Sequence, residues 1–161
     1  MPTPVKPIPD GYTAVTPYLT IKGAAEAIDF YKRAFGAEEV MRMNLPDGKV
    51  AHAEIRINRS VIMLHDEAPA WNALSPQTIG DSGASIMLYV DDVDTVFKRA
   101  LDAGATSIMP VADQFYGDRL GALKDPFGHK WSVATHVEDV APDELRRRAA
   151  KRFEQQAQQQ Q

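Results

Sequence analysis

The chain has 161 residues, of which 44% are hydrophobic and 25% charged, and its formal net charge is -4 at pH 7. This composition is typical of a soluble globular protein built as one domain or as two half-domains. The acidic balance argues against a nucleic acid or an anionic membrane as partner, and the absence of cysteine excludes disulfides, thiolate catalysis and cysteine-bound zinc. No apolar run has the length of a signal peptide or a membrane span, so we expect a cytoplasmic protein.

A proline-rich segment opens the chain. Four prolines fall within the first nine residues, a density that rules out a helix or a central strand. We therefore predict that residues 1–11 form an extended arm, lying on the surface or on a partner subunit.

The next segment, residues 12–66, has the pattern of one strand, one helix and three strands. Its first strand begins at Ala14 and alternates apolar with polar residues, and Pro17 makes it an edge strand. An amphipathic helix then spans residues 24–35 and ends at Gly36, because glycine adopts the left-handed conformation that terminates helices. Three strands are predicted to follow, at residues 39–44, 50–58 and 60–65.

Residues 67–83, rich in proline and glycine, are predicted to form a linker or flexible loop. The pattern then restarts in residues 84–137, with a helix at 93–103 and strands near 85–90, 107–109, 119–124 and 130–135. Beyond it we predict a surface helix over residues 138–154, whose basic side chains form a solvated face rather than a nucleic-acid site. The glutamine-rich tail, residues 155–161, is expected to be disordered.

The two predicted helices carry nearly the same sequence. Residues 30–37 (FYKRAFGA) are echoed by residues 96–105 (VFKRALDAGA), a separation suited to two duplicated half-domains rather than to a solenoid. The predicted fold is therefore α+β: two tandem βαβββ modules that form a curved mixed sheet around a cavity, followed by a C-terminal helix.

Together with a late hairpin at residues 125–131 (DPFGHKW), these modules resemble the vicinal oxygen chelate superfamily, which includes glyoxalase I, extradiol dioxygenases and the bleomycin resistance proteins. Three further segments resemble its PhnB-like, glyoxalase-related branch: HAE at 52–54, MLHDE at 63–67 and DQFYGDR at 113–119. The resemblance covers about residues 12–140 and implies a ligand cavity between modules and a homodimer. It is specific for the fold rather than the reaction, because most matching residues shape the scaffold.

Members of this superfamily that use a metal take its ligands from strands that face the cavity. The resemblance places the four ligand positions at Thr16, Met63, Ser85 and Ser132. Hydroxyls and a thioether supply neither the charge nor the donor strength that a divalent transition metal requires. We therefore expect no metal and no other cofactor, and a divalent metal only if the alignment shifts by two residues and brings in Tyr18 and His65.

His52 and Glu54 alternate with apolar Ala53 and Ile55, so both are predicted to point away from the helix. On that face the carboxylate is close enough to orient the imidazole as a general base, which makes the pair, joined by His65, the candidate catalytic group. The alternative is an exposed polar strand face at the rim of the cavity or in a dimer interface.

Other aromatic and polar residues are candidates for ligand contact. The loop at residues 114–119 combines aromatic rings, an amide and a guanidinium, groups that suit a planar or anionic molecule. The candidate ligand-binding residues are Tyr18, His65, Tyr89, Gln114, Tyr116 and Arg119. The alternatives are packing for the two strand tyrosines, a turn at Tyr116, and an ion pair of Arg119 with Asp118 or Asp125.

These observations leave two main hypotheses for function. The first is a metal-independent protein that binds a small organic molecule between its βαβββ modules, as in the bleomycin resistance branch. The second is a glyoxalase-like lyase or isomerase that uses His52 and Glu54, with or without a divalent metal. A protein-interaction subunit that uses the arm and the basic tail is a third.

Overall fold

The computed structural model describes residues 4–159. The first module contains β1 (Tyr18–Ile21), α1 (Ala24–Phe35), β2 (Glu38–Asn44), β3 (Val50–Ile57) and β4 (Ser60–Asp66). Its four strands form one sheet in the order β1-β4-β3-β2, in which β1 and β4 are parallel and the other neighbours antiparallel. The predicted βαβββ pattern is confirmed in this half of the chain.

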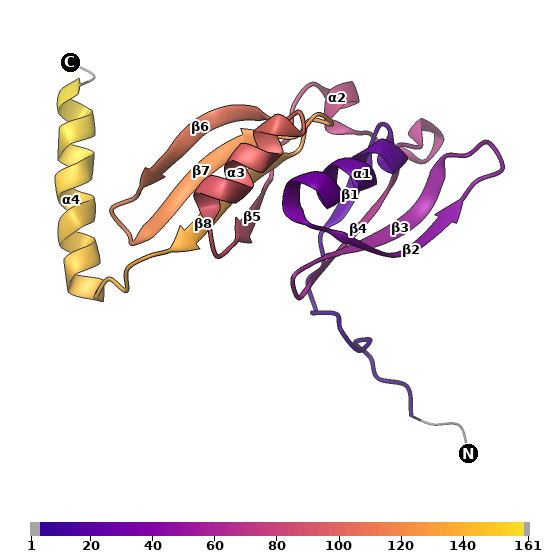
Figure 1. Ribbon diagram of the computed structural model, residues 1–161, viewed down its shortest axis with the longest axis horizontal. Helices are drawn as coiled ribbons and strands as arrows, with labels where there is room; N and C mark the ends of the chain where they lie inside the picture. The colour runs from indigo at the N-terminus through magenta and orange to yellow at the C-terminus, as the bar shows by residue number, and fades with distance from the viewer. Residues whose placement is uncertain (1–3, 160–161) are drawn as a thin grey trace.

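The second module repeats the arrangement with β5 (Ser85–Tyr89), α3 (Val93–Asp102), β6 (Thr106–Asp113), β7 (Asp118–Lys124) and β8 (Lys130–His136). Its sheet order, β5-β8-β7-β6, is the same as that of the first module. The two modules therefore confirm the predicted α+β fold, although their strands form two separate four-stranded sheets rather than one (Figure 1).

α1 and α3 each cover one face of the sheet in their own module, and the two helices also lie against each other (Figure 1). Strand residues under the helices are buried and alternate with more exposed ones, as Leu19 and Ile21 do with Tyr18 and Thr20 on β1. We call the face that the helix of each module does not cover the open face. The alternation predicted from the sequence thus places His52 on the open face of the first module and Ile55 beneath α1.

A buried carboxylate joins the two modules. Asp125, which is only 3% exposed, accepts a hydrogen bond from the hydroxyl of Tyr31 on α1 at 2.6 Å and from Nε1 of Trp131 on β8 at 2.9 Å. The imidazole Nε2 of His129 adds a second link, 3.1 Å from the carbonyl oxygen of Thr20. Burial is the main cause that raises the pKa of Tyr31 well above its ordinary value, with the neighbouring Asp125 carboxylate adding to it.

The segment between the modules has more structure than the predicted loop. It contains a short 3-10 helix, η1 (Pro69–Trp71), and one turn of helix, α2 (Pro76–Ile79). Glu67 holds this segment by accepting hydrogen bonds from the backbone N–H of Ser75 and the hydroxyl of Thr78, which lower the pKa of its carboxyl to about 2.

The C-terminal helix, α4 (Pro142–Gln159), begins later and runs further than predicted. Residues 155–159, for which the sequence predicts disorder, are helical, because glutamine and alanine are good helix formers and no glycine or proline interrupts them. Residues 160–161, and residues 1–3 of the predicted arm, lie outside the described residues. α4 stands at the end of the molecule opposite the N-terminal arm (Figure 1), where Arg148 binds Glu138 at 2.7 Å.

Within residues 4–159, no helix combines the length and apolar character needed to cross a membrane.

The start of α1 depends on a carboxylate from another strand. Gly23 precedes the helix and has no side chain to cap it. Asp66, at the end of β4, accepts hydrogen bonds from the N–H groups of Gly23 and Ala24 at 3.0 and 2.9 Å, and its second oxygen accepts one from Val50 at 2.7 Å. This carboxylate therefore satisfies N–H groups that the first turn leaves free.

We predict that Asp66→Ala lowers the free energy of unfolding by about 2 kcal/mol, because it removes the acceptor of three backbone N–H groups. Urea denaturation measures the change. Asp47→Ala is the control, since Asp47 accepts one hydrogen bond, from the exposed Lys49 N–H at 3.0 Å, and should cost only about 0.5 kcal/mol. Equal losses in the two variants would show that Asp66 has no capping role.

Candidate functional site

Four side chains on the open face of the first module form a continuous hydrogen-bonded chain. The hydroxyl of Tyr18 on β1 lies 2.8 Å from Nδ1 of His52 on β3, and Nε2 of His52 lies 3.1 Å from Oε1 of Glu54. Tyr12, from the segment that precedes β1, donates its hydroxyl to Oε2 of the same carboxylate. We call Tyr12, Tyr18, His52 and Glu54 the His52 cluster.

The strand register explains how these groups meet. His52 and Glu54 are two residues apart on β3 and so share one face of the sheet. Tyr18 pairs with Met63 on β4, which in turn pairs with Glu54, so the tyrosine reaches His52 across the intervening strand. The predicted pairing of His52 with Glu54 is therefore present in the structure, and Tyr18 joins it.

The charge state of Glu54 determines which group donates and which accepts in each hydrogen bond of the His52 cluster. The hydrogen bond from Tyr12 is the main cause that lowers the pKa of the Glu54 carboxyl, and His52 also contributes. An ionised carboxylate only accepts hydrogen bonds, so Nε2 of His52 donates to it. In the neutral imidazole this leaves Nδ1 as an acceptor for the Tyr18 hydroxyl.

His65 lies beside the His52 cluster but belongs to a different set of hydrogen bonds. Its Nε2 is 3.1 Å from the Thr20 hydroxyl, and its Nδ1 is 2.7 Å from the carbonyl oxygen of Asp66. Its ring contacts Tyr18 edge to face, with centroids 5.0 Å apart. Both imidazole nitrogens are thus engaged within the first module, and His65 supports the ring of Tyr18.

A second polar cluster occupies the second module. Tyr89 on β5 donates its hydroxyl to Asp118 at 2.8 Å, and Nδ1 of His136 lies 2.7 Å from the other oxygen of Asp118. Nε2 of His136 is 2.8 Å from Asp139, and hydrogen bonds to Asp139 and Asp118 raise the pKa of this imidazole. Tyr89 was a candidate from the sequence, whereas Asp118 and His136 were not; the facing ends of β7 and β8 bring those two together.

The remaining candidates lie apart from the His52 cluster. The guanidinium of Arg119 binds Asp94 on α3 at 2.7 and 2.8 Å and Asp113 at 3.1 Å, so its partners are not the two aspartates considered from the sequence. Arg119 follows Asp118 on β7 and therefore points to the opposite face of the sheet.

Gln114 and Tyr116, the two other candidates in the loop before β7, contact residues that are near them in the sequence. The amide of Gln114 donates to the carbonyl oxygen of Ala112 at 3.1 Å. Tyr116 packs edge to face against Phe115, and burial is the main cause that raises the pKa of its hydroxyl.

The positions that resemble metal-ligand sites carry weak donors. Met63 lies opposite Tyr18, and Ser132 lies opposite Met87, on the open faces of their sheets. Among residues 4–159, no group of three or more histidine, aspartate or glutamate side chains is arranged to hold a metal ion.

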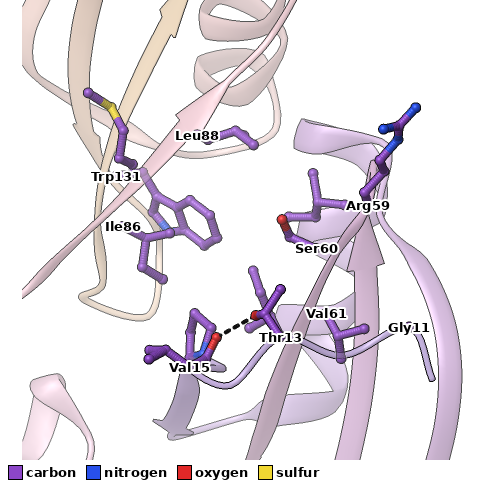
Figure 2. Close-up of a pocket in the computed structure, with 13 residues that line it drawn as sticks. Gly11, Thr13, Val15, Arg59, Ser60, Val61, Ile86, Leu88 and Trp131 are labelled. Atoms are coloured by element: carbon purple, nitrogen blue, oxygen red, sulfur yellow. Dashed lines mark hydrogen bonds between the residues drawn. The ribbon is translucent and has the colours of Figure 1, made fainter. Parts of the chain in front are cut away.

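A pocket of about 150 Å³ lies between the modules, and none of its lining residues belongs to the His52 cluster (Figure 2). Figure 2 shows Trp131 and Ile86 of the second module on one side and Ser60 and Val61 of the first on the other. The segment that precedes β1, residues 11–17, borders a third side, where the hydroxyl of Thr13 donates to the carbonyl oxygen of Val15 at 2.7 Å. In the single chain, this pocket is therefore at the module junction, whereas the His52 cluster lies on an open sheet face.

Paired βαβββ modules, each with a polar cluster on its open face, define the class of protein to which the chain belongs. Comparison with known families agrees, since the profile of the Glyoxalase/Bleomycin resistance protein/Dioxygenase superfamily matches residues 12–133. The chain belongs to this superfamily, which confirms the resemblance noted in the sequence.

The chain is also similar to individual proteins and solved structures. The Mycobacterium bovis protein Mb0911c is 45% identical over 135 residues, which cover 82% of this chain and 89% of that protein. The X-ray structure of the Arabidopsis thaliana At5g48480 product, 28% identical, superposes with a TM-score of 0.62 over 76% of this chain and 98% of that one. The PhnB protein from Bacillus cereus, 23% identical, shares the fold with a TM-score of 0.60 over 76% of this chain and 99% of its own.

Proposed function

We propose that this chain binds a small organic molecule in the cytoplasm, as a homodimer, with the ligand held at the His52 cluster and no transition metal at Thr16, Met63, Ser85 or Ser132. The observation that carries the proposal is the Tyr18 hydroxyl. Its side chain is 54% exposed on an open sheet face, yet its hydroxyl is held by a histidine that is itself held by a carboxylate. A solvated surface tyrosine does not need such support.

The residues around the cluster favour a ligand with apolar surface. Met43 lies opposite His52 across the β2–β3 ladder, and Met41 lies opposite Glu54. Met63 lies opposite Glu54 from the other side, so thioether side chains border the polar groups on both flanks. Methionine adapts its shape to irregular apolar partners, and a few oriented polar groups within an apolar lining are typical of small-molecule sites.

The proposal of a homodimer rests on the exposure of both open faces. Met43 is 52% exposed in the first module, and Tyr89 and Met87 are 53% and 46% exposed in the second. A ligand bound on one face of a single sheet would stay half solvated, and a partner's open face is the complementary surface that would enclose it. Sedimentation equilibrium of the full chain tests this part directly.

A ligand-observed NMR screen of a small-molecule library tests the binding function. We predict hits that bind protein stripped of metal by a chelator, and that bind Met43→Ser and Glu54→Gln roughly tenfold more weakly, about 1.4 kcal/mol each. Ile79→Ser is the matched control, because Ile79 is an exposed apolar residue on α2, outside the cluster. Hits unaffected by the two cluster variants, or lost after metal removal, would refute the proposed site.

The orientation of His52 by Glu54 favours a second candidate function, a glyoxalase-like lyase or isomerase in which the imidazole acts as general base. Its test is turnover of a hemithioacetal. Turnover by the wild-type protein, lost in a folded His52→Ala variant, would make this the correct function; a lack of turnover would leave the binding function.

A further inference from the structure

Toward a bound ligand, the Tyr18 hydroxyl is arranged to accept a hydrogen bond rather than to donate one. When the His52 ring is neutral, its Nε2 donates to Glu54 at 3.1 Å, so its Nδ1 accepts the hydrogen of the Tyr18 hydroxyl at 2.8 Å. This exposed side chain therefore presents the lone pairs of its phenolic oxygen to a ligand, as a hydrogen-bond acceptor.

We infer that the ligand of this site is a small molecule with a weakly acidic hydroxyl, a phenol or an enol, and that Tyr18 accepts its hydrogen bond and relays its proton to His52. The inference rests on the proposed binding function at the same cluster. In the transfer, the O–H bond of the ligand breaks and a new O–H bond forms on Tyr18, while the original Tyr18 proton moves to Nδ1 of His52. The products are a ligand anion and an imidazolium, so atoms and charge balance.

The groups around His52 support this transfer. Glu54 stabilises the imidazolium, and Tyr12 holds the second oxygen of that carboxylate so that it cannot turn away. Arg56, the next residue on the same face of β3, adds a positive charge that favours an anion on the ligand. His65 contacts the Tyr18 ring and keeps both of its own nitrogens engaged elsewhere, and from β2 the neighbour opposite His52 is the uncharged Met43.

Tyr89 is the matched control within the same chain. Like Tyr18, it lies on the first strand of its module, is about half exposed and reaches across one strand to a polar partner. Its hydroxyl, however, donates directly to the Asp118 carboxylate, with no imidazole between them to receive a proton. Both modules thus present a tyrosine hydroxyl on the open face. Of these two tyrosines, Tyr18 is the one whose hydroxyl contacts an imidazole that can receive its proton.

The test uses 4-nitrophenol, whose anion absorbs visible light, and 4-nitroanisole, which has nearly the same shape and no acidic hydrogen. At a pH just below the pKa of free 4-nitrophenol, the full-chain protein is expected to raise the ratio of anion to neutral phenol roughly tenfold on binding, about one pKa unit. Tyr18→Phe and His52→Gln should abolish that increase, and Tyr89→Phe should retain it. Tyr18→Phe removes one hydroxyl from a residue that is 54% exposed, so we expect the fold to stay intact.

Each result has a distinct meaning. Equal affinity for the two probes without ionisation of 4-nitrophenol would overturn the relay, and so would ionisation that persists in Tyr18→Phe. Failure of 4-nitrophenol to bind would overturn the phenol or enol class, whereas the proposed function fails if the NMR screen finds no ligand, or only ligands that the cluster variants do not weaken or that need a metal.

Discussion

Replacing Asp125 with alanine is expected to lower the free energy of unfolding by about 4 kcal/mol, because several buried donors lose their acceptor at once, at about 1–3 kcal/mol each. The carboxylate accepts the Tyr31 hydroxyl and the Trp131 Nε1 on one oxygen, and the backbone N–H groups of Phe127 and His129, each at 2.9 Å, on the other. The variant would therefore disrupt the β7–β8 hairpin and the contact between modules together.

Tyr31→Phe is the control for this prediction. It removes one of the donors and leaves the hairpin bonds intact, so the expected loss is about 1–2 kcal/mol. Urea unfolding followed by tryptophan fluorescence suits the measurement, since Trp131 is buried at the junction while Trp71 is 86% exposed and should respond little. An Asp125→Ala variant no less stable than Tyr31→Phe would show that the carboxylate does not join the modules.

Replacing Gly117 with alanine should cost about 3 kcal/mol, the second largest effect we expect. Gly117 has a φ of +101°, which L side chains rarely adopt, and an added Cβ would overlap the carbonyl oxygen of Glu138. Its own carbonyl oxygen accepts the N–H groups of Val137 and Glu138 at 2.9 and 3.0 Å. The new methyl group would push this segment away and break both bonds, which loosens the attachment of α4.

Gly80→Ala separates the backbone strain of a positive φ from the overlap of the added Cβ with neighbouring atoms. Gly80 has a similar φ of +112°, and nothing lies within 4 Å of an added Cβ, so only the backbone strain of about 1 kcal/mol applies. Hydrogen exchange of the α4 amides, measured alongside unfolding, should accelerate in Gly117→Ala and stay unchanged in Gly80→Ala. Equal losses of stability in the two variants would exclude the close approach of Glu138 as the cause.

Local patterns in the sequence were enough to predict the two modules and the pairing of His52 with Glu54 in the His52 cluster. The alternation of His52 and Glu54 with buried Ala53 and Ile55 follows from the period of a β-strand, in which successive side chains leave opposite faces. The stop of α1 at Gly36, with φ of +66°, follows from the freedom of glycine to adopt left-handed backbone. Such features depend on neighbouring residues alone, and they are legible without a structure.

Only the tertiary structure determined which side chains complete each group. Tyr12 lies 42 positions before Glu54, and Tyr31 lies 94 positions before Asp125, so neither contact leaves a periodic trace in the sequence. Likewise, Arg119 binds Asp94 on α3 rather than an aspartate close to it in the chain. Strand period determines the face to which a side chain points, but the packing of the segment before β1, of the helices and of the second module determines what that side chain meets.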